Sequence, residues 1–143
     1  MSHPSLRESL LRSFLDRVWS SGKINAADSF LADAYTIHHD PGDPWEGMTL
    51  DRAAFKERVT VSRAPFPDQR FDVQALFEDG PAVAVTWLWS ATHLGDLPGL
   101  PASGRRVTMS GATVYSFTAS DRLEGHWQVV DRLGLYRQLR EAA

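Results

Sequence analysis

The sequence predicts an α+β domain in which helices cover one face of a curved, mostly antiparallel sheet and leave a pocket between the two layers. Three observations lead to this prediction. Apolar residues recur at helical spacing in the first twenty residues, strands rich in Val, Thr, Trp, Phe and Tyr begin near residue 70, and the links between those strands are short. Helices followed by long antiparallel strands are typical of the α+β class, and a strongly twisted sheet curls around the helices in its hollow.

The first half of the chain predicts three helices and one strand. Ser5 and Glu8 form a capping-box pattern that begins a helix, and Gly22 follows its last turn. Thr49 is expected to cap the third helix, which stops before Pro65 because a residue preceding proline disfavours helical geometry. A short second helix is expected from Asn25 to Leu31, and a strand from Ala34 to His39.

The second half predicts four long strands and a short tail. The strands are expected at Arg70–Glu78, Ala82–His93, Arg105–Thr118 and Leu123–Asp131, and the tail at Leu133–Ala143. Turn-forming residues separate consecutive strands, so each strand can pair with the next in antiparallel fashion.

The composition is that of an ordinary globular protein, and we expect residues 1–143 to form one domain. Hydrophobic residues make up 43% of the chain, and scattered charges sum to −3, which gives no electrostatic footprint for nucleic acid. The lack of cysteine excludes disulfides and thiolate nucleophiles. Charges spread through the first twenty residues argue against a signal peptide, and no apolar run is long enough for a membrane span. We therefore expect a cytoplasmic protein.

Side-chain alternation predicts which residues line the pocket, because the bulkier face of each strand should point inward. The inward set comprises His39, Trp87, Trp89, His93, Tyr115, Phe117, Trp127 and Asp131. On this assignment Asp131 points a carboxylate into an apolar face. Burial there would disfavour the charged form and make Asp131 a candidate acid/base group near neutral pH.

Each candidate also has a purely structural interpretation. Asp131 could cap the turn that follows it or pair with a neighbouring arginine, and His93 could be a solvated strand end. His39 could belong to the turn chemistry of the next two residues, and the tryptophans could be ordinary core. All of these assignments depend on regular alternation, because a shift of one residue exchanges the two faces of a strand.

Familiar catalytic and metal-binding motifs are missing from the sequence. There is no phosphate-binding loop, GxGxxG, HExxH or GxSxG pattern. His38 and His39 are adjacent in a predicted strand, so their imidazoles point to opposite faces and do not converge on one ion. We expect neither a metal nor a cofactor.

Five short segments in order resemble the SnoaL-like polyketide cyclases of the NTF2-like superfamily. They are Ala64-Pro65-Phe66-Pro67-Asp68, Thr92-His93-Leu94-Gly95-Asp96, the loop Gly99 to Arg105, Glu124-Gly125-His126-Trp127 with Asp131, and Leu135-Tyr136-Arg137-Gln138-Leu139. The resemblance covers most of the chain and implies an NTF2-like cone. It also implies the family's acid/base aspartate at Asp131, its strand-end histidine at His93 and a polar pocket position at His39. Ala91 departs from the family's usual glycine.

The resemblance implies an intramolecular aldol ring closure of a polyketide ester without metal or cofactor. In that reaction Asp131 would act first as base and then as acid, and His93 or Tyr115 would donate to the developing oxyanion. The aromatic walls, formed by Trp87, Trp89, Phe117 and Trp127, would hold a flat, largely apolar carbonyl compound.

Two other functions stay open at this point. A ketosteroid-isomerase-like isomerase or a hydrolase would need an inward carboxylate on another strand, and the obvious candidate, Asp72, should face outward. A non-catalytic binding or association module would pair two copies through the outer sheet face, at residues such as Leu88 and Ala112. An exposed Asp131 would favour this module. In each case we expect a homodimer or a higher homo-oligomer.

Overall fold

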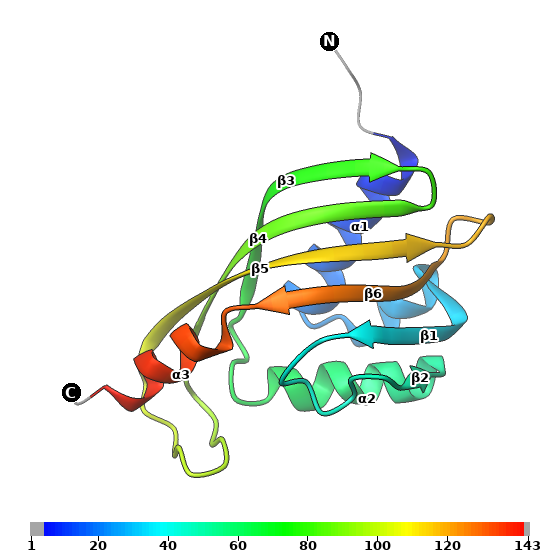
Figure 1. Cartoon of the computed structure of the whole chain (residues 1–143). Coiled ribbons are helices and arrows are strands. Elements are labelled where there is room, and N and C mark those ends of the chain that lie inside the picture. Colours follow the sequence, from blue (N-terminus) through cyan, green and yellow to red (C-terminus); the bar gives the residue numbers. More distant parts are fainter. Residues whose placement is uncertain (1–4, 142–143) are drawn as a thin grey trace.

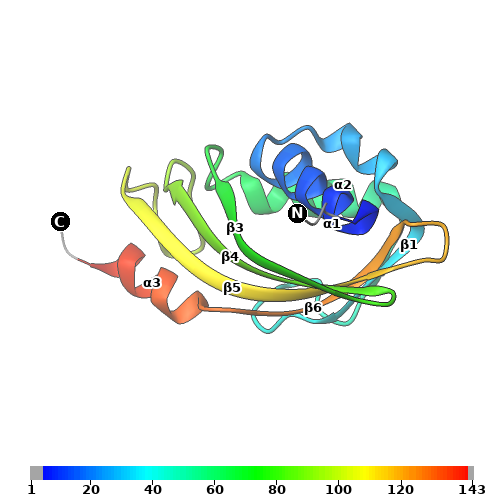
Figure 2. The same cartoon turned by 90° about the horizontal axis from the view of Figure 1, so that it is seen from above.

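A six-stranded sheet curls around the N-terminal helices in the computed structural model, which describes residues 5–141 (Figures 1 and 2). The elements are α1 (Leu6–Phe14), a π-helix (Leu15–Ser20), a 3-10 helix (Ile24–Ser29), β1 (Leu31–His39), β2 (Thr49–Leu50), α2 (Arg52–Arg63), β3 (Arg70–Asp79), β4 (Ala82–Thr92), β5 (Arg106–Phe117), β6 (Leu123–Val130) and α3 (Arg132–Arg140). The strand order is β2-β1-β6-β5-β4-β3, with β1 and β6 parallel and the other pairs antiparallel. The predicted α+β class is confirmed.

The first helix begins and ends as predicted, but its geometry changes along its length. The Ser5 hydroxyl accepts a hydrogen bond from the Glu8 backbone N–H at 3.1 Å, and Gly22 adopts a left-handed φ of 71°. From Leu15 the helix continues as a π-helix. Trp19 lies in the last turn, where carbonyl groups lack an intrahelical partner, and its carbonyl accepts from Arg63 Nε at 2.9 Å, which ties the N-terminal helix to α2.

Two predicted boundaries are corrected by the structure. Thr49 does not cap α2 but lies in β2 opposite Thr36, and the helix is capped by Asp51, whose carboxylate accepts from the Ala54 N–H at 2.7 Å. The predicted short tail is instead the helix α3, whose cap is Asp131. Both corrections arise because an aspartate just before the helix competes well for the free N–H groups of its first turn.

The core lies between the concave face of the sheet and helices α1 and α2 (Figure 2). Phe14, Tyr35 and Phe55 are buried at its centre. The alternation predicted for β4 is confirmed by a continuous buried face, formed by Val83, Val85, Trp87, Trp89, Ala91 and His93. The same holds for the aromatic residues of β5, Tyr115 and Phe117.

A β-bulge in β6 reverses the alternation predicted for that strand. Gly125 pairs with Ser116, whereas Leu123 pairs with the next residue of β5, so Glu124 is an extra residue in β6. After the bulge, His126 is buried and Trp127 is 47% exposed. The predicted inward set of this strand is therefore wrong, because one extra residue exchanges the two faces.

A second bulge acts in the same way at the end of β1. Ile37 pairs with His126 and His39 with Trp127, so His38 is the extra residue. As a result Asp40 is fully buried, while His39 lies outside and stacks on Trp127 with ring centroids 4.5 Å apart. Because of the two bulges, His39 and Trp127 lie outside the sheet, and Asp40 and His126 lie inside it instead.

Within the described residues, no helix combines the length and the apolar character needed to cross a membrane.

Candidate functional site

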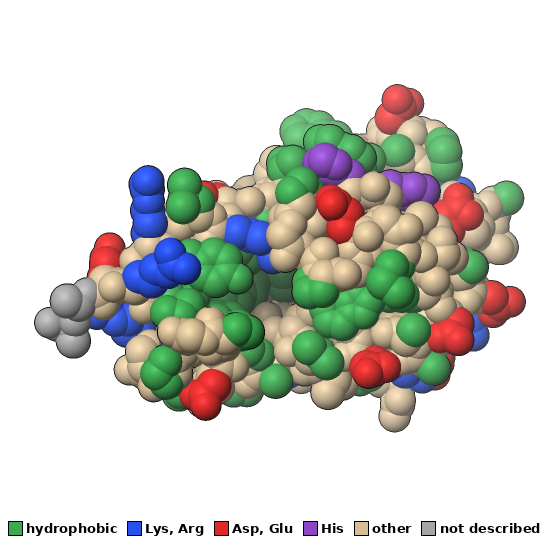
Figure 3. All heavy atoms as spheres, turned by 60° about the horizontal axis from the view of Figure 1, so that its bottom comes forward, with side chains coloured by type: hydrophobic (Ala, Val, Ile, Leu, Met, Phe, Trp, Pro, Cys, Tyr) green, Lys and Arg blue, Asp and Glu red, His purple; other side chains and the backbone are tan. Residues whose placement is uncertain are grey.

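A cavity of about 150 Å³ opens at the end of the sheet where α3 begins. Figure 3 shows a hollow on this side of the molecule, with hydrophobic side chains on its rim and a basic side chain beside it. One side of the cavity is polar and the other is aromatic and aliphatic. Its lining includes Trp19, Tyr35, Asp43, Arg58, Ser62, Phe66, Gln69, Phe71, Trp87, Trp89, Met109, Tyr115, His126, Gln128, Val130, Arg132 and Leu135.

The buried carboxylate of Asp40 organises the polar side from behind the lining. Arg132 Nη2 donates to one carboxylate oxygen at 2.8 Å, and His126 Nε2 lies 2.9 Å from the other. Gln128 Nε2 reaches both oxygens, at 3.2 and 3.1 Å, and Arg58 Nη2 lies at 3.4 Å. A buried carboxylate tolerates loss of solvent only when it is paired and hydrogen-bonded in this way.

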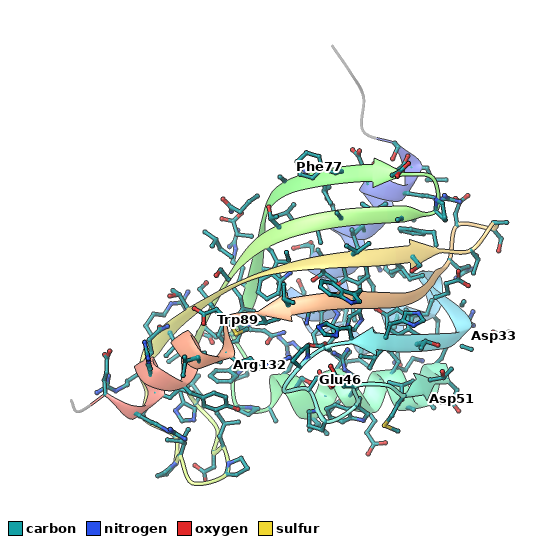
Figure 4. All side chains as sticks on the ribbon, in the orientation of Figure 1. Asp33, Glu46, Asp51, Phe77, Trp89 and Arg132 are labelled. Carbon is teal, nitrogen blue, oxygen red and sulfur yellow. The ribbon has the colours of Figure 1, made fainter. Side chains whose placement is uncertain are left out.

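Arg58 and Arg132 reach Asp40 from two different helices, α2 and α3. Arg58 is buried in α2, stacks over Trp19 with its guanidinium 5.2 Å from the ring centroid, and also donates to Asp43 at 2.8 Å. Arg132 extends from the start of α3 toward the loop after β1 (Figure 4), where its Nε donates to the Pro41 carbonyl at 2.9 Å. The charges on this side of the cavity therefore come as two carboxylates and two guanidinium groups.

The protonation states in this network follow from the partners. Burial alone would raise the pKa of Asp40, but the hydrogen bond from His126 and the charges of Arg132 and Arg58 hold it below its ordinary value. Burial lowers the pKa of His126, and the hydrogen bond to Asp40 offsets this only in part. At neutral pH the site thus contains an ionised Asp40 and a neutral imidazole.

The tautomer of His126 follows from these charges. The ionised Asp40 accepts, so His126 Nε2 carries the proton, and Nδ1 is left as an acceptor. Nδ1 lies 2.7 Å from the Tyr35 hydroxyl, which therefore donates to it. Burial keeps the pKa of Tyr35 well above its ordinary value, so the phenol retains its proton. Tyr35, His126 and Asp40 form a continuous line of hydrogen bonds that ends at the cavity lining.

The aromatic wall is held in place by its own hydrogen bonds. The indole N–H of Trp87 donates to Thr113 Oγ1 at 2.9 Å, and Thr113 donates to Gln128 Oε1 at 2.6 Å, which connects the wall to the polar side. Trp87 lies across Gly111, where an added Cβ would come within 2.4 Å of the indole. The missing side chain at Gly111 is what allows the ring to lie flat on β5.

Trp89 and Tyr115 complete this wall. The Trp89 indole donates to Gln69 at 3.1 Å, and Gln69 donates to the Trp19 carbonyl of the π-helix at 2.9 Å. Burial raises the pKa of Tyr115, so the phenol, which belongs to the cavity lining, keeps its proton. Tyr115 is therefore available as a donor to a molecule in the cavity.

The structure brings together three of the predicted site residues and separates the rest. Trp87, Trp89 and Tyr115 line the cavity. His93 and Phe117 are buried, but neither belongs to the lining. The Nδ1 atom of His93 instead lies 3.0 Å from the Ser103 hydroxyl, in the loop after β4. His39 and Trp127 stack against each other on the outside of the sheet.

Asp131 is exposed and caps α3, which contradicts its predicted position inside the pocket. Its carboxylate accepts from the Gly134 N–H at 2.9 Å. The structural interpretation of this residue, a cap of the following turn, matches the geometry. Its predicted acid/base role is not tested by this placement and stays a prediction.

Sequence reasoning missed Asp40, His126, Tyr35 and the two arginines. One signal for His126 was available, because an isolated glycine within a strand pattern, here Gly125, indicates a bulge or a close backbone approach. An added Cβ at Gly125 would lie 2.6 Å from the Thr36 carbonyl of β1. Asp40 gave no comparable signal, since an aspartate before Pro41 is ordinary in a turn.

The described part of the chain contains no group of three or more His, Asp and Glu side chains arranged to hold a metal ion. The hydrogen-bonded line Tyr35–His126–Asp40, which reaches the cavity lining, can transfer protons to and from a molecule held against the aromatic wall.

A curved sheet wrapped around helices, with a small cavity at its open end, defines an NTF2-like domain. The chain belongs to the SnoaL-like polyketide cyclase family, whose model matches residues 9–139. A crystal structure of a candidate polyketide cyclase from Acidithiobacillus ferrooxidans shares 57% sequence identity over 100% of both chains, with a TM-score of 0.94.

More distant relatives agree with this membership. The aklanonic acid methyl ester cyclase DauD of Streptomyces sp. (strain C5) is 28% identical over 129 residues, which cover 86% of this chain and 75% of DauD. The crystal structure of IdmH, a candidate polyketide cyclase from Streptomyces antibioticus, is 23% identical, covers 94% of this chain and 99% of IdmH, and has a TM-score of 0.80. At that identity the likeness to IdmH shows the fold.

Proposed function

We propose that this protein catalyses an intramolecular aldol-type ring closure of a small carbonyl compound, with His126 as its acid/base group. The observation that carries the proposal is a neutral, buried imidazole in the cavity lining, backed by the ionised Asp40. An imidazole with a pKa below neutrality is a competent base at pH 7, and the carboxylate behind it stabilises the imidazolium that forms. Membership of a family with ester cyclases among its relatives supports this chemistry.

Proton transfer runs through Tyr35, because both ring nitrogens of His126 are already engaged. The phenol oxygen takes a proton from the carbon between two carbonyl groups while its own proton passes to His126 Nδ1. The enolate carbon then forms a bond to the second carbonyl carbon. The new alkoxide takes the phenol proton, and His126 returns its extra proton to Tyr35. Tyr115 donates to the enolate oxygen.

Two single substitutions test the proton route. His126→Gln and Tyr35→Phe are expected to lower kcat by about 100-fold or more, a typical loss for a general acid/base group. Asp131→Asn is the matched control and should retain activity, since Asp131 lies outside the cavity. Turnover is followed by chromatography on methyl esters of aromatic diketo acids. Normal turnover by the His126→Gln variant, or loss of turnover in the Asp131→Asn variant, would contradict the assignment of the acid/base role to His126.

The pH profile separates His126 from other bases. The enzyme must hold His126 neutral, so kcat/KM should rise with pH through the His126 pKa, which lies below the ordinary value of about 6.5, and level off by neutral pH. If a carboxylate such as Asp43 were the base instead, the His126→Gln variant would keep the rate and the pH dependence of the wild-type protein.

The exposure of Asp131 favours the non-catalytic module over an enzyme that uses Asp131. The same exposure does not favour the non-catalytic module over an enzyme that uses His126, because the buried Tyr35–His126–Asp40 line supplies an acid/base group inside the cavity. Asp72 is exposed as predicted, which leaves the isomerase alternative without its carboxylate.

A further inference from the structure

We propose that Thr113 and Gln128 are positioning residues, which hold Trp87 in the aromatic wall through one line of hydrogen bonds that ends at the Asp40 carboxylate. The wall and the proton route then share a single anchor, although they lie on different sides of the cavity. These roles deepen the proposed function and rest on it only for the part that the wall plays in holding the substrate. The test is spectroscopic and needs no turnover, so a failure of ring closure in the activity test gives a separate result.

The direction of each hydrogen bond in this line follows from Asp40. An ionised carboxylate can only accept, so the Gln128 amide turns its Nε2 toward Asp40, whose two oxygens lie 3.2 and 3.1 Å away. The amide oxygen Oε1 then faces Thr113, whose hydroxyl donates to it at 2.6 Å. The Thr113 oxygen is left to accept the Trp87 indole N–H, at 2.9 Å. Every donor in the line therefore points toward Asp40, and a reversed amide would set its oxygen against the carboxylate.

Burial makes this line costly to break. Trp87 and Thr113 are only 3% and 1% exposed, and a buried donor that loses its acceptor incurs most of its desolvation cost. The plane of the Trp87 ring is fixed by Gly111, across which it lies, and by Phe71, which packs edge-on with ring centroids 4.9 Å apart. The hydrogen bond to Thr113 fixes the rotation of the indole within that plane.

Trp89 belongs to the same wall but to a different line of hydrogen bonds. Its indole donates to Gln69 Oε1 at 3.1 Å, and Gln69 donates to the Trp19 carbonyl at 2.9 Å. That line ends at an uncharged backbone group, so Trp89 should not respond to the charge on Asp40. Because Trp87 and Trp89 lie in the same strand and line the same cavity, Trp89 is a matched internal control.

The indole N–H signals in a nitrogen–proton correlation spectrum test the proposal. The chain has five tryptophans, and the variants Trp87→Phe and Trp89→Phe assign the two signals of the wall. Thr113→Val removes the acceptor but keeps the shape of the side chain, so it should move the Trp87 proton upfield and leave the Trp89 proton in place. Thr113→Ser retains the hydroxyl and should keep the Trp87 proton at its wild-type position.

Removal of the charge on Asp40 tests the full length of the line. Asp40→Asn should move the Trp87 proton upfield by about 10–30% of the shift caused by Thr113→Val, because each bond in a hydrogen-bond chain strengthens its neighbour by about that fraction. In the Thr113→Val background, Asp40→Asn should leave the Trp87 signal unchanged. Gln128→Met cuts the line without removing the charge, should have the same two effects, and replaces Asp40→Asn if that variant does not fold.

Three results would overturn the proposal. They are a Trp87 signal that does not respond to Thr113→Val, a Trp87 signal that responds to neither Asp40→Asn nor Gln128→Met, and a response of equal size with and without the Thr113 hydroxyl. The last result, like an equal shift of the Trp89 signal, would show that Asp40 affects the wall through the packing of the fold rather than through Gln128 and Thr113.

Discussion

At the residue scale, the site depends most on Asp40. Its carboxylate is fully buried and receives hydrogen bonds from His126, Gln128, Arg132 and Arg58. It does not line the cavity, so it acts on a bound molecule through its neighbours. Asp40 is therefore a positioning residue that sets the tautomer of His126.

Replacing Asp40 should reveal this role as a stability effect that depends on pH. Asp40→Asn leaves two guanidinium groups short of a buried countercharge and should lower the free energy of unfolding by about 3 kcal/mol at pH 7. Because the folded-state pKa of Asp40 lies below its ordinary value of about 3.9, the carboxylate stabilises the fold above that value, and the benefit is lost as the pH falls through the folded-state pKa.

Urea unfolding followed by tryptophan fluorescence at several pH values measures this difference. The gap between wild type and Asp40→Asn should be full at pH 7 and shrink in acid. Asp33→Asn is a suitable control, because the Asp33 side chain is fully exposed (Figure 4) and its loss should change little. A gap that stays constant down to pH 3 would show that lost packing, rather than lost charge, causes the effect.

At the element scale, most of the sheet and the aromatic side of the cavity could be predicted, whereas the polar side could not. Regular alternation correctly placed Trp87, Trp89 and Tyr115 inside, because β4 and β5 pair without interruption over that stretch. Alternation failed in β6 and at the end of β1, where one extra residue in each strand reverses the faces. A bulge depends on how two strands meet, so residues of one strand alone carry little information about it.

The cap of α3 gives a second prediction. Asp131→Ala should lower the free energy of unfolding by about 1 kcal/mol, since it removes a side-chain acceptor from the first turn, whereas Asp131→Asn should cost little because Asn is an equally good cap. Asp51→Ala at the start of α2 (Figure 4) provides the comparison at another helix. Chemical denaturation measures all three. An equal loss in the Asn and Ala variants of Asp131 would rule out capping as its main structural role.

At the scale of the whole molecule, the convex face of the sheet offers a surface on which two copies could pair. Trp127 and Val129 lie on β6 beside Val114 and Ala112 of β5, and Leu88 lies on the neighbouring β4. Trp127, Val129 and Leu88 are 47%, 44% and 50% exposed, respectively, an unusual degree for adjacent apolar side chains. We propose that a homodimer covers this face, with the same patch on both copies.

Charges placed on this face test the proposal. The double variant Trp127→Glu, Val129→Glu should convert a dimer to a monomer in sedimentation equilibrium, because like charges would meet across a self-complementary interface. Met48→Glu is the control, since Met48 is 48% exposed and lies on the loop side of β2. A wild-type protein that sediments as a monomer at high concentration would refute pairing through this face.

The chain positions of the Asp40 partners have a consequence for synthesis. His126, Gln128 and Arg132 follow Asp40 by 86, 88 and 92 residues, and only Arg58 among its partners is made soon afterwards. Ribosomes add about 5–20 residues per second, so the nascent chain carries this carboxylate for several seconds before His126, Gln128 and Arg132 are made. During that interval the buried environment of Asp40 is incomplete, because three of its four side-chain partners belong to β6 and α3. A protein that ends before β6 would lack three of the four side chains that allow the Asp40 carboxylate to be buried away from water.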